Sequence, residues 1–138
     1  MPGTGSTIGL RAWWPPMAAT CAVLVMHAIP GSSFKSDDWW AVWHVDKVVH
    51  AVAFAVWGLS VSIAWAKQRK FQKPHAFAIR MLLTGLIFGM VLEAMQGAWM
   101  QGRSADPWDV LADLLGTGVS LWIFRGIFGQ WPGRIAND

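Results

Sequence analysis

The segment that decides the fold is FAIRMLLTGLIFGMVLEAMQGAW, residues 77–99. Only two of its 23 side chains are charged, Arg80 and Glu93, and twelve consecutive uncharged residues lie between them. A helix rises about 1.5 Å per residue, and the hydrocarbon core of a bilayer is about 30 Å thick. A run of this length and composition therefore predicts a transmembrane helix.

Three further apolar segments accompany this one, over residues 13–29, 45–66 and 107–128. The first has about 17 residues, which is the lower limit for crossing a bilayer. Its basic start also fits a cleaved signal peptide, but Trp13 and Trp14 suit an interface anchor and favour a retained span. We predict an all-α, integral membrane bundle of four transmembrane helices, forming a single domain over residues 1–138.

The composition agrees with a membrane protein. Charged residues make up 14% of the chain, whereas a soluble domain carries roughly a quarter. Eleven tryptophans and no tyrosine are present, and tryptophan is typical of membrane interfaces. The basic residues lie between apolar segments and are not interleaved with aromatic ones, so membrane lipid, and no nucleic acid, is the expected partner. A single cysteine, Cys21, excludes a disulfide framework.

Charge predicts the orientation. The connection between the second and third segments contains no acid, and its basic residues are Lys67, Arg69, Lys70 and Lys73. By the positive-inside rule this connection is cytoplasmic, and Arg11, Arg125 and Arg134 agree with that choice. Both termini are then cytoplasmic in a bacterial inner membrane, and residues 31–44 and 100–106 face outward.

Polar residues gather at the predicted outer ends of three segments. They are Asp46, Lys47, His50, Glu93, Gln96, Arg103, Asp106, Asp109 and Asp113. If these segments are helices, Asp113 lies about 6 Å deeper in the membrane than Asp109. His50 lies deeper than Asp46 by the same distance. An ionisable group facing lipid costs about 3 kcal/mol. We therefore expect these side chains to share one polar pocket in the outer leaflet.

Small residues share a face with one of these acids. Gly85, Gly89 and Gly97 repeat at every fourth position together with Glu93. Small residues at this spacing let helices approach closely in lipid. Gly89 should therefore lie at a helix contact.

Simpler structural roles also fit several of these residues. Asp106 suits a helix N-cap, with proline next and Asp109 at the third position. Asp46 also suits an N-cap, Lys47 can extend to the headgroups, and His27 can reach water near the end of its segment. Capping leaves His50, Glu93, Gln96 and Asp113 unexplained. For these four residues, a purely structural network between three helices is the alternative to a functional site.

Three motifs in order resemble the VanZ-like family of membrane proteins. Residues 46–50 resemble its D-K-x-x-H start of a span, with Phe54 where the family has Tyr or Phe. Residues 93–96 resemble its E-x-x-Q. Its R-x-x-[DS]-x-x-D-x-x-x-N block is similar to residues 103–113, except that Asp113 replaces the usual Asn. The motif-bearing part covers about residues 45–120.

The resemblance implies a four-helix membrane protein associated with the cell envelope. The family's founding members are linked to low-level resistance to glycopeptide antibiotics, notably teicoplanin. We expect an accessory or binding protein whose pocket takes a lipid headgroup or envelope precursor, with Lys47 and Arg103 as anion-binding groups.

Two alternatives remain. One is a structural subunit with membrane-protein partners. The other is a membrane enzyme that acts on a lipid or envelope precursor. In that enzyme His50 would act as acid or base beside Glu93, and Asp109 and Asp113 would hold a divalent metal. The acids show no strong metal spacing, and no Ser, Cys or Thr nucleophile is clearly paired with a base. Catalysis is therefore not favoured, and neither a metal nor a cofactor is expected.

Overall fold

The computed structural model describes residues 11–29, 45–67, 73–99 and 105–132. These residues form four helices and no strand, which confirms the all-α class for this part of the chain. The helices are α2 (Trp14–Ala28), α4 (Val45–Lys67), α5 (Pro74–Trp99) and α6 (Pro107–Phe128). Most of the two segments predicted to face outward falls outside the described residues, as do Arg69, Lys70 and Arg134.

Three of these helices are long and apolar enough to cross a membrane. α4, α5 and α6 have 23, 26 and 22 residues, with mean hydropathies of 1.8, 1.8 and 1.4. The fourth predicted span is not confirmed, because α2 has only 15 residues and is about 22 Å long at the helical rise, less than the hydrocarbon core. The chain is thus a multi-pass membrane protein with three candidate spans.

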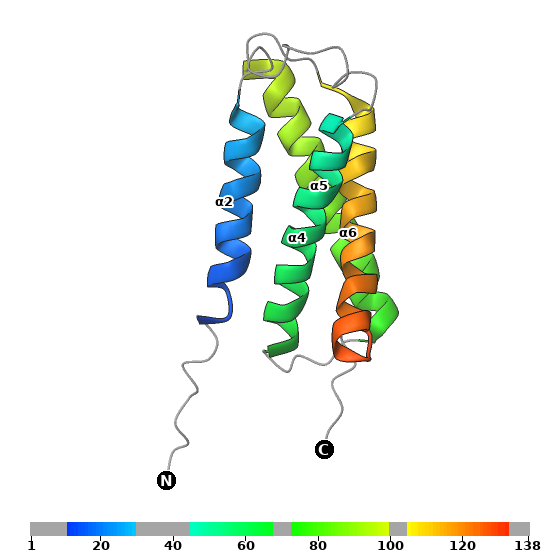
Figure 1. The fold of residues 1–138 in the computed structure, drawn as a ribbon. Helices are drawn as coiled ribbons and strands as arrows, with labels where there is room; N and C mark the ends of the chain where they lie inside the picture. Colours follow the sequence, from blue (N-terminus) through cyan, green and yellow to red (C-terminus); the bar gives the residue numbers. More distant parts are fainter. Residues whose placement is uncertain (1–10, 30–44, 68–72, 100–104, 133–138) are drawn as a thin grey trace.

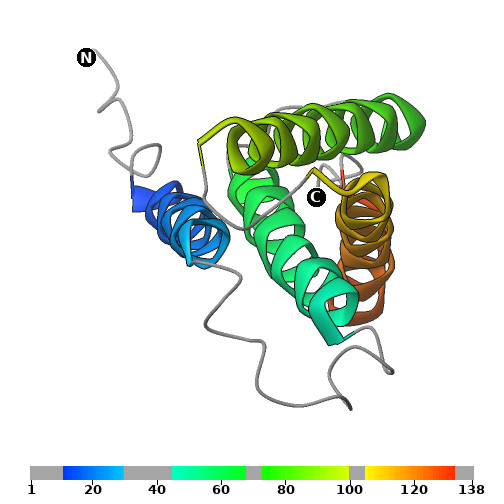
Figure 2. The ribbon, with the colours of Figure 1, turned by 90° about the horizontal axis from the view of Figure 1, so that it is seen from above.

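Consecutive helices run in opposite directions (Figure 1). The ends of α2 and α5 lie at the same end of the bundle as the starts of α4 and α6. α6 packs most extensively against α4 and also contacts α5, whereas α2 lies mainly against α4. Figure 2 shows α2 at the side of the group formed by the three long helices. This arrangement brings the polar ends of α4, α5 and α6 together.

Small residues allow the close approach of α6 to both of its neighbours. A Cβ atom at Gly116 would collide with the backbone of Ala51 on α4. On the other side, a Cβ atom at Gly89 of α5 would meet the Asp113 side chain. The prediction that Gly89 lies at a helix contact is confirmed. Polar and packing faces coincide because the same contact contains Asp113.

The outward faces of the long helices are apolar. Large exposed side chains on these faces include Val52, Val56, Ile87, Met90, Leu115 and Val119. The interior contains the buried side chains of Phe54, Trp57, Leu92 and Leu121. Apolar exposure on this scale is typical of a surface that contacts lipid or another protein.

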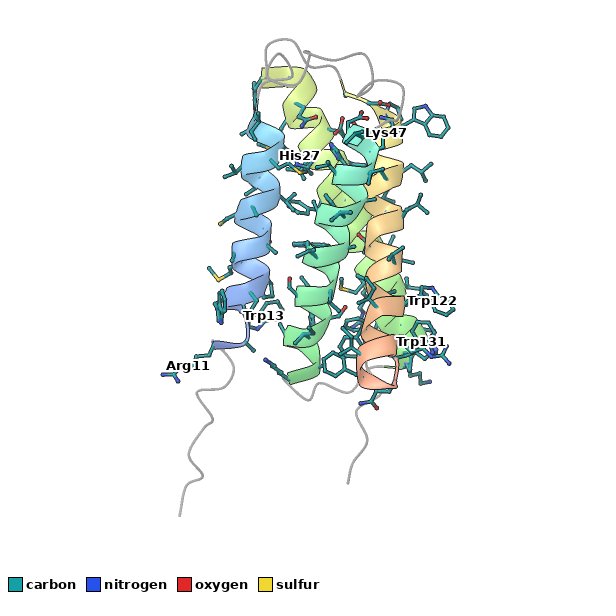
Figure 3. All side chains as sticks on the ribbon, viewed as in Figure 1. Arg11, Trp13, His27, Lys47, Trp122 and Trp131 are labelled. Carbon is teal, nitrogen blue, oxygen red and sulfur yellow. The ribbon has the colours of Figure 1, made fainter. Side chains whose placement is uncertain are left out.

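Aromatic and basic side chains lie at one end of the bundle, opposite to the starts of α4 and α6. Figure 3 shows Arg11, Trp13 and Trp131 at this end, and His27 and Lys47 toward the other. The Arg125 guanidinium lies 4.8 Å from the centre of the Trp131 ring, a cation–π distance. The orientation predicted from these basic residues therefore applies to one whole end of the bundle and stays a prediction.

Cysteine labelling should test that orientation. In a Cys21→Ala background, an impermeant maleimide added outside intact cells should modify Ala105→Cys but not Lys73→Cys. Both residues are exposed, at opposite ends of the bundle. Permeabilised cells, in which both positions should react, provide the control. Labelling of position 73 alone in intact cells would reverse the orientation.

Candidate functional site

The polar cluster lies at one end of the bundle, where α4 and α6 begin and α5 ends (Figure 3). Lys47, in the first turn of α4, occupies its outer part. The Lys47 ammonium donates to Asp106 Oδ2 at 2.6 Å, to Asp109 Oδ1 at 2.6 Å and to Asp46 Oδ2 at 3.3 Å. An ammonium has three N–H donors, and here each has a carboxylate within hydrogen-bonding distance. Lys47 thus links α4 to the start of α6.

Asp106 caps α6 as predicted. Its Oδ1 accepts a hydrogen bond from the Trp108 amide at 2.9 Å, and Pro107 is the first helical residue. The hydrogen bond from Lys47, together with that from the Trp108 amide, holds the pKa of the Asp106 carboxyl below its usual range. The N-cap alternative for Asp46 is wrong, because α4 already begins at Val45 and Asp46 lies in its first turn.

His50 lies one turn deeper than Asp46 on α4 and is buried against α6. Its Nδ1 lies 3.0 Å from Asp113 Oδ1. Its Nε2 lies 3.9 Å from Asp109 Oδ2, which is too long for a hydrogen bond. The His50 and Asp113 residues are 4% and 0% exposed. The imidazole therefore lies between two carboxylates of α6, with one hydrogen bond to the deeper carboxylate.

Glu93 contributes a carboxylate from α5. Its Oε2 accepts a hydrogen bond from the Asp106 amide at 2.8 Å, so it also helps to fix the start of α6. Its Oε1 is buried and has no hydrogen-bond partner among the described residues. One donor atom each from His50, Glu93 and Asp109 lie within 4.8 Å of one another. The three long helices thus meet at three polar side chains.

Gln96 lies beside this group and contacts α2. Its Nε2 donates to the His27 carbonyl oxygen at 3.2 Å. The His27 ring packs edge-on against His50, with centroids 4.6 Å apart, and its Nδ1 lies 2.8 Å from the Val23 carbonyl oxygen. The expectation that His27 reaches water is wrong, because the end of α2 is covered and the residue is only 2% exposed.

A comparison with known protein families assigns the chain to one of them. The model of the VanZ/LLP1 family matches residues 11–129, which is most of the chain. The chain belongs to the VanZ/LLP1 family. No curated protein and no solved structure matches it. The resemblance drawn from three short motifs is therefore confirmed at the level of the family.

The motifs of this VanZ/LLP1 protein meet at a single centre, although they are far apart in the chain. The residues brought together are Asp46, Lys47, His50, Glu93, Gln96, Asp106, Asp109 and Asp113. Arg103, the remaining member of the predicted set, lies outside the described residues. His27 is an addition that spacing did not reveal; its only signal was its position near the outer end of an apolar segment.

The described part of this centre in the VanZ/LLP1 protein is acidic. Five carboxylic acids accompany one ammonium group and two imidazoles. Lys47 already contacts three of the acids. Such a set attracts cations and accepts hydrogen bonds more readily than it binds an anion directly.

Proposed function

We propose that this protein is an envelope-associated accessory protein of the bacterial inner membrane, and that it binds the polar head of an envelope ligand at its acidic centre. The observation that carries this proposal is the burial of His50, Glu93 and Asp113 within membrane-spanning helices. Ionisable residues are rare in such helices and are a default sign of function. Glu93 and Asp113 each have a buried oxygen with no hydrogen-bond partner among the described residues, which is costly in a purely structural network.

The excess of carboxylates among the described residues of the centre restricts the chemistry of the ligand. Direct anion binding by Lys47, as expected from the sequence, is not favoured, because its donors already contact Asp46, Asp106 and Asp109. A ligand that presents an amine or carries a bound cation fits the centre better than a bare phosphate. A lipid headgroup or an envelope precursor with an amino group meets this requirement.

In the proposed arrangement all four helices lie in the membrane, and both termini lie in the cytoplasm. α2 is joined to the long helices by polar contacts at two depths. Trp57 Nε1 donates to Thr20 Oγ1 at 3.1 Å, and Gln96 donates to the His27 carbonyl oxygen at 3.2 Å. A short helix held in this way can be accommodated by local thinning of the bilayer.

A structural subunit is the second candidate. It is favoured by the Lys47 contacts, because one ammonium joins the starts of α4 and α6 and satisfies carboxylates that would otherwise need a ligand. In that case the acidic centre would stabilise the bundle and leave the exposed apolar faces to contact partner proteins.

Native mass spectrometry should separate the two functions. Protein extracted from its own membrane in mild detergent should retain a lipid or precursor adduct. We expect Glu93→Gln to lose this adduct and Val91→Ala, on the exposed face of the same helix, to keep it. Identical adducts for both variants and the unmodified chain would favour the structural role.

A cellular assay extends the same comparison to antibiotic tolerance, which we include in the proposed function. Cells that express the unmodified chain should tolerate more teicoplanin than cells that express Glu93→Gln at equal membrane abundance. Equal growth inhibition in both strains would remove tolerance from the proposed function.

A further inference from the structure

The donor atoms of His50, Glu93 and Asp109 have the spacing of ligands around a cation. They come from α4, α5 and α6 and lie within 4.8 Å of one another. Around Zn²⁺, bonds of about 2.1 Å to nitrogen and oxygen place tetrahedral neighbours roughly 3.4 Å apart. The 3.9 Å between His50 Nε2 and Asp109 Oδ2 is too long for a hydrogen bond and exceeds that separation by about half an ångström.

The orientation of His50 is that of a metal ligand. Nδ1 lies 3.0 Å from Asp113 Oδ1, and the other ring nitrogen, Nε2, lies 3.9 Å from Asp109 Oδ2. A histidine that binds a metal commonly donates its other ring N–H to a carboxylate in this manner. With a cation bound, Asp113 would be a positioning residue that accepts the Nδ1 proton of His50 and leaves Nε2 to bind the cation.

An unsatisfied oxygen provides independent support. Glu93 is 3% exposed, and its Oε1 has no hydrogen-bond partner among the described residues. Lys47 does not satisfy the same region, because it contacts the Oδ1 atom of Asp109, while Oδ2 is the atom nearer to His50. A cation between the three side chains would satisfy Glu93 Oε1 and offset the excess of carboxylates.

We infer that His50, Glu93 and Asp109 bind a divalent cation with mixed nitrogen and oxygen preference, such as Zn²⁺ or Mn²⁺. A second set of donor atoms, from His27, His50 and Asp113, also lies within 4.8 Å of one another. That second set would use the carboxylate that already holds His50 Nδ1. The role of this cation rests on the proposed function: it would give the polar head of an envelope ligand a positively charged partner.

The test uses the full chain, purified with a tag that contains no histidine and stripped of metal by a chelator. Calorimetric titration with Zn²⁺ and with Mn²⁺ should show one site per chain for at least one of these ions. Glu93→Gln and Asp109→Asn should each weaken binding by about 100-fold, and Asp113→Asn by about 10- to 100-fold. His75→Gln removes an exposed histidine at the opposite end of the bundle and should bind as the unmodified chain does.

Monodisperse gel filtration and a cooperative thermal transition will identify the variants that fold. The inference is overturned if the folded, unmodified chain binds neither ion, or if Glu93→Gln and Asp109→Asn both bind normally. Loss of binding in Asp113→Asn and His27→Gln, but not in Asp109→Asn, would also overturn it in favour of the second set. A retained lipid adduct without metal binding would defeat this inference alone. Metal binding without any adduct would defeat only the proposed function.

Discussion

Substitution of Gly116 by alanine should destabilise the bundle more than any other single methyl group added to α6. The added Cβ would overlap the carbonyl oxygen, the carbonyl carbon and the Cα atom of Ala51. All three are backbone atoms, so the overlap is relieved only if α4 and α6 move apart. Overpacking commonly costs about 1–3 kcal/mol, and we expect a value at or above the upper limit here.

Gly126→Ala provides a matched control on the same helix. No atom lies within 4 Å of a Cβ built at Gly126. Alanine is favoured over glycine in a helix by about 1 kcal/mol, so this variant should be neutral or more stable. Unfolding in detergent, followed by circular dichroism, measures both variants. Equal stability would show that α4 and α6 are not in close contact at Gly116.

The helix boundaries were predictable where local chemistry marks them. α6 spans Pro107–Phe128 as expected, because Asp106 caps its start and Gly129 ends it with a positive φ of 67°. α5 begins at Pro74, three residues before the predicted start, because proline is tolerated in a first turn and hydropathy does not detect polar turns outside the membrane core. The sequence was a poorer guide to the first predicted span. Its apolar run covers residues 13–29, but the helix formed there, α2, has only 15 residues.

Depth and helical face predicted which polar residues would gather at one end of the bundle. They did not predict the partners, because depth and face place a side chain on its own helix but do not say which helix lies against it. Lys47 contacts acids 59 and 62 residues away, and such pairs depend on α6 lying against α4. The place of Arg103 in the pocket stays a prediction, and the described contacts centre on Lys47.

The contacts of Lys47 make it the charged residue whose removal should be most damaging. Its side chain is 24% exposed, and that of Asp109 is 13% exposed. Replacing Lys47 with methionine keeps the length of the side chain but leaves Asp106 and Asp109 without their shared cation. Removal of one partner from a buried ion pair costs about 3–5 kcal/mol, and we expect the lower limit because Lys47 is partly exposed.

A double-mutant cycle isolates the interaction of Lys47 with Asp109. Asp109→Asn removes one carboxylate charge, so Lys47→Met should cost less in that background, with a coupling of about 1–3 kcal/mol. Unfolding should be measured with a chelator present, so that no bound metal compensates for the lost ammonium. Lys67→Met, exposed at the other end of α4, should change stability by less than about 0.5 kcal/mol. If the two losses of stability simply add in the double variant, Lys47 and Asp109 do not interact. Lys47 would then not hold α4 to α6 through Asp109.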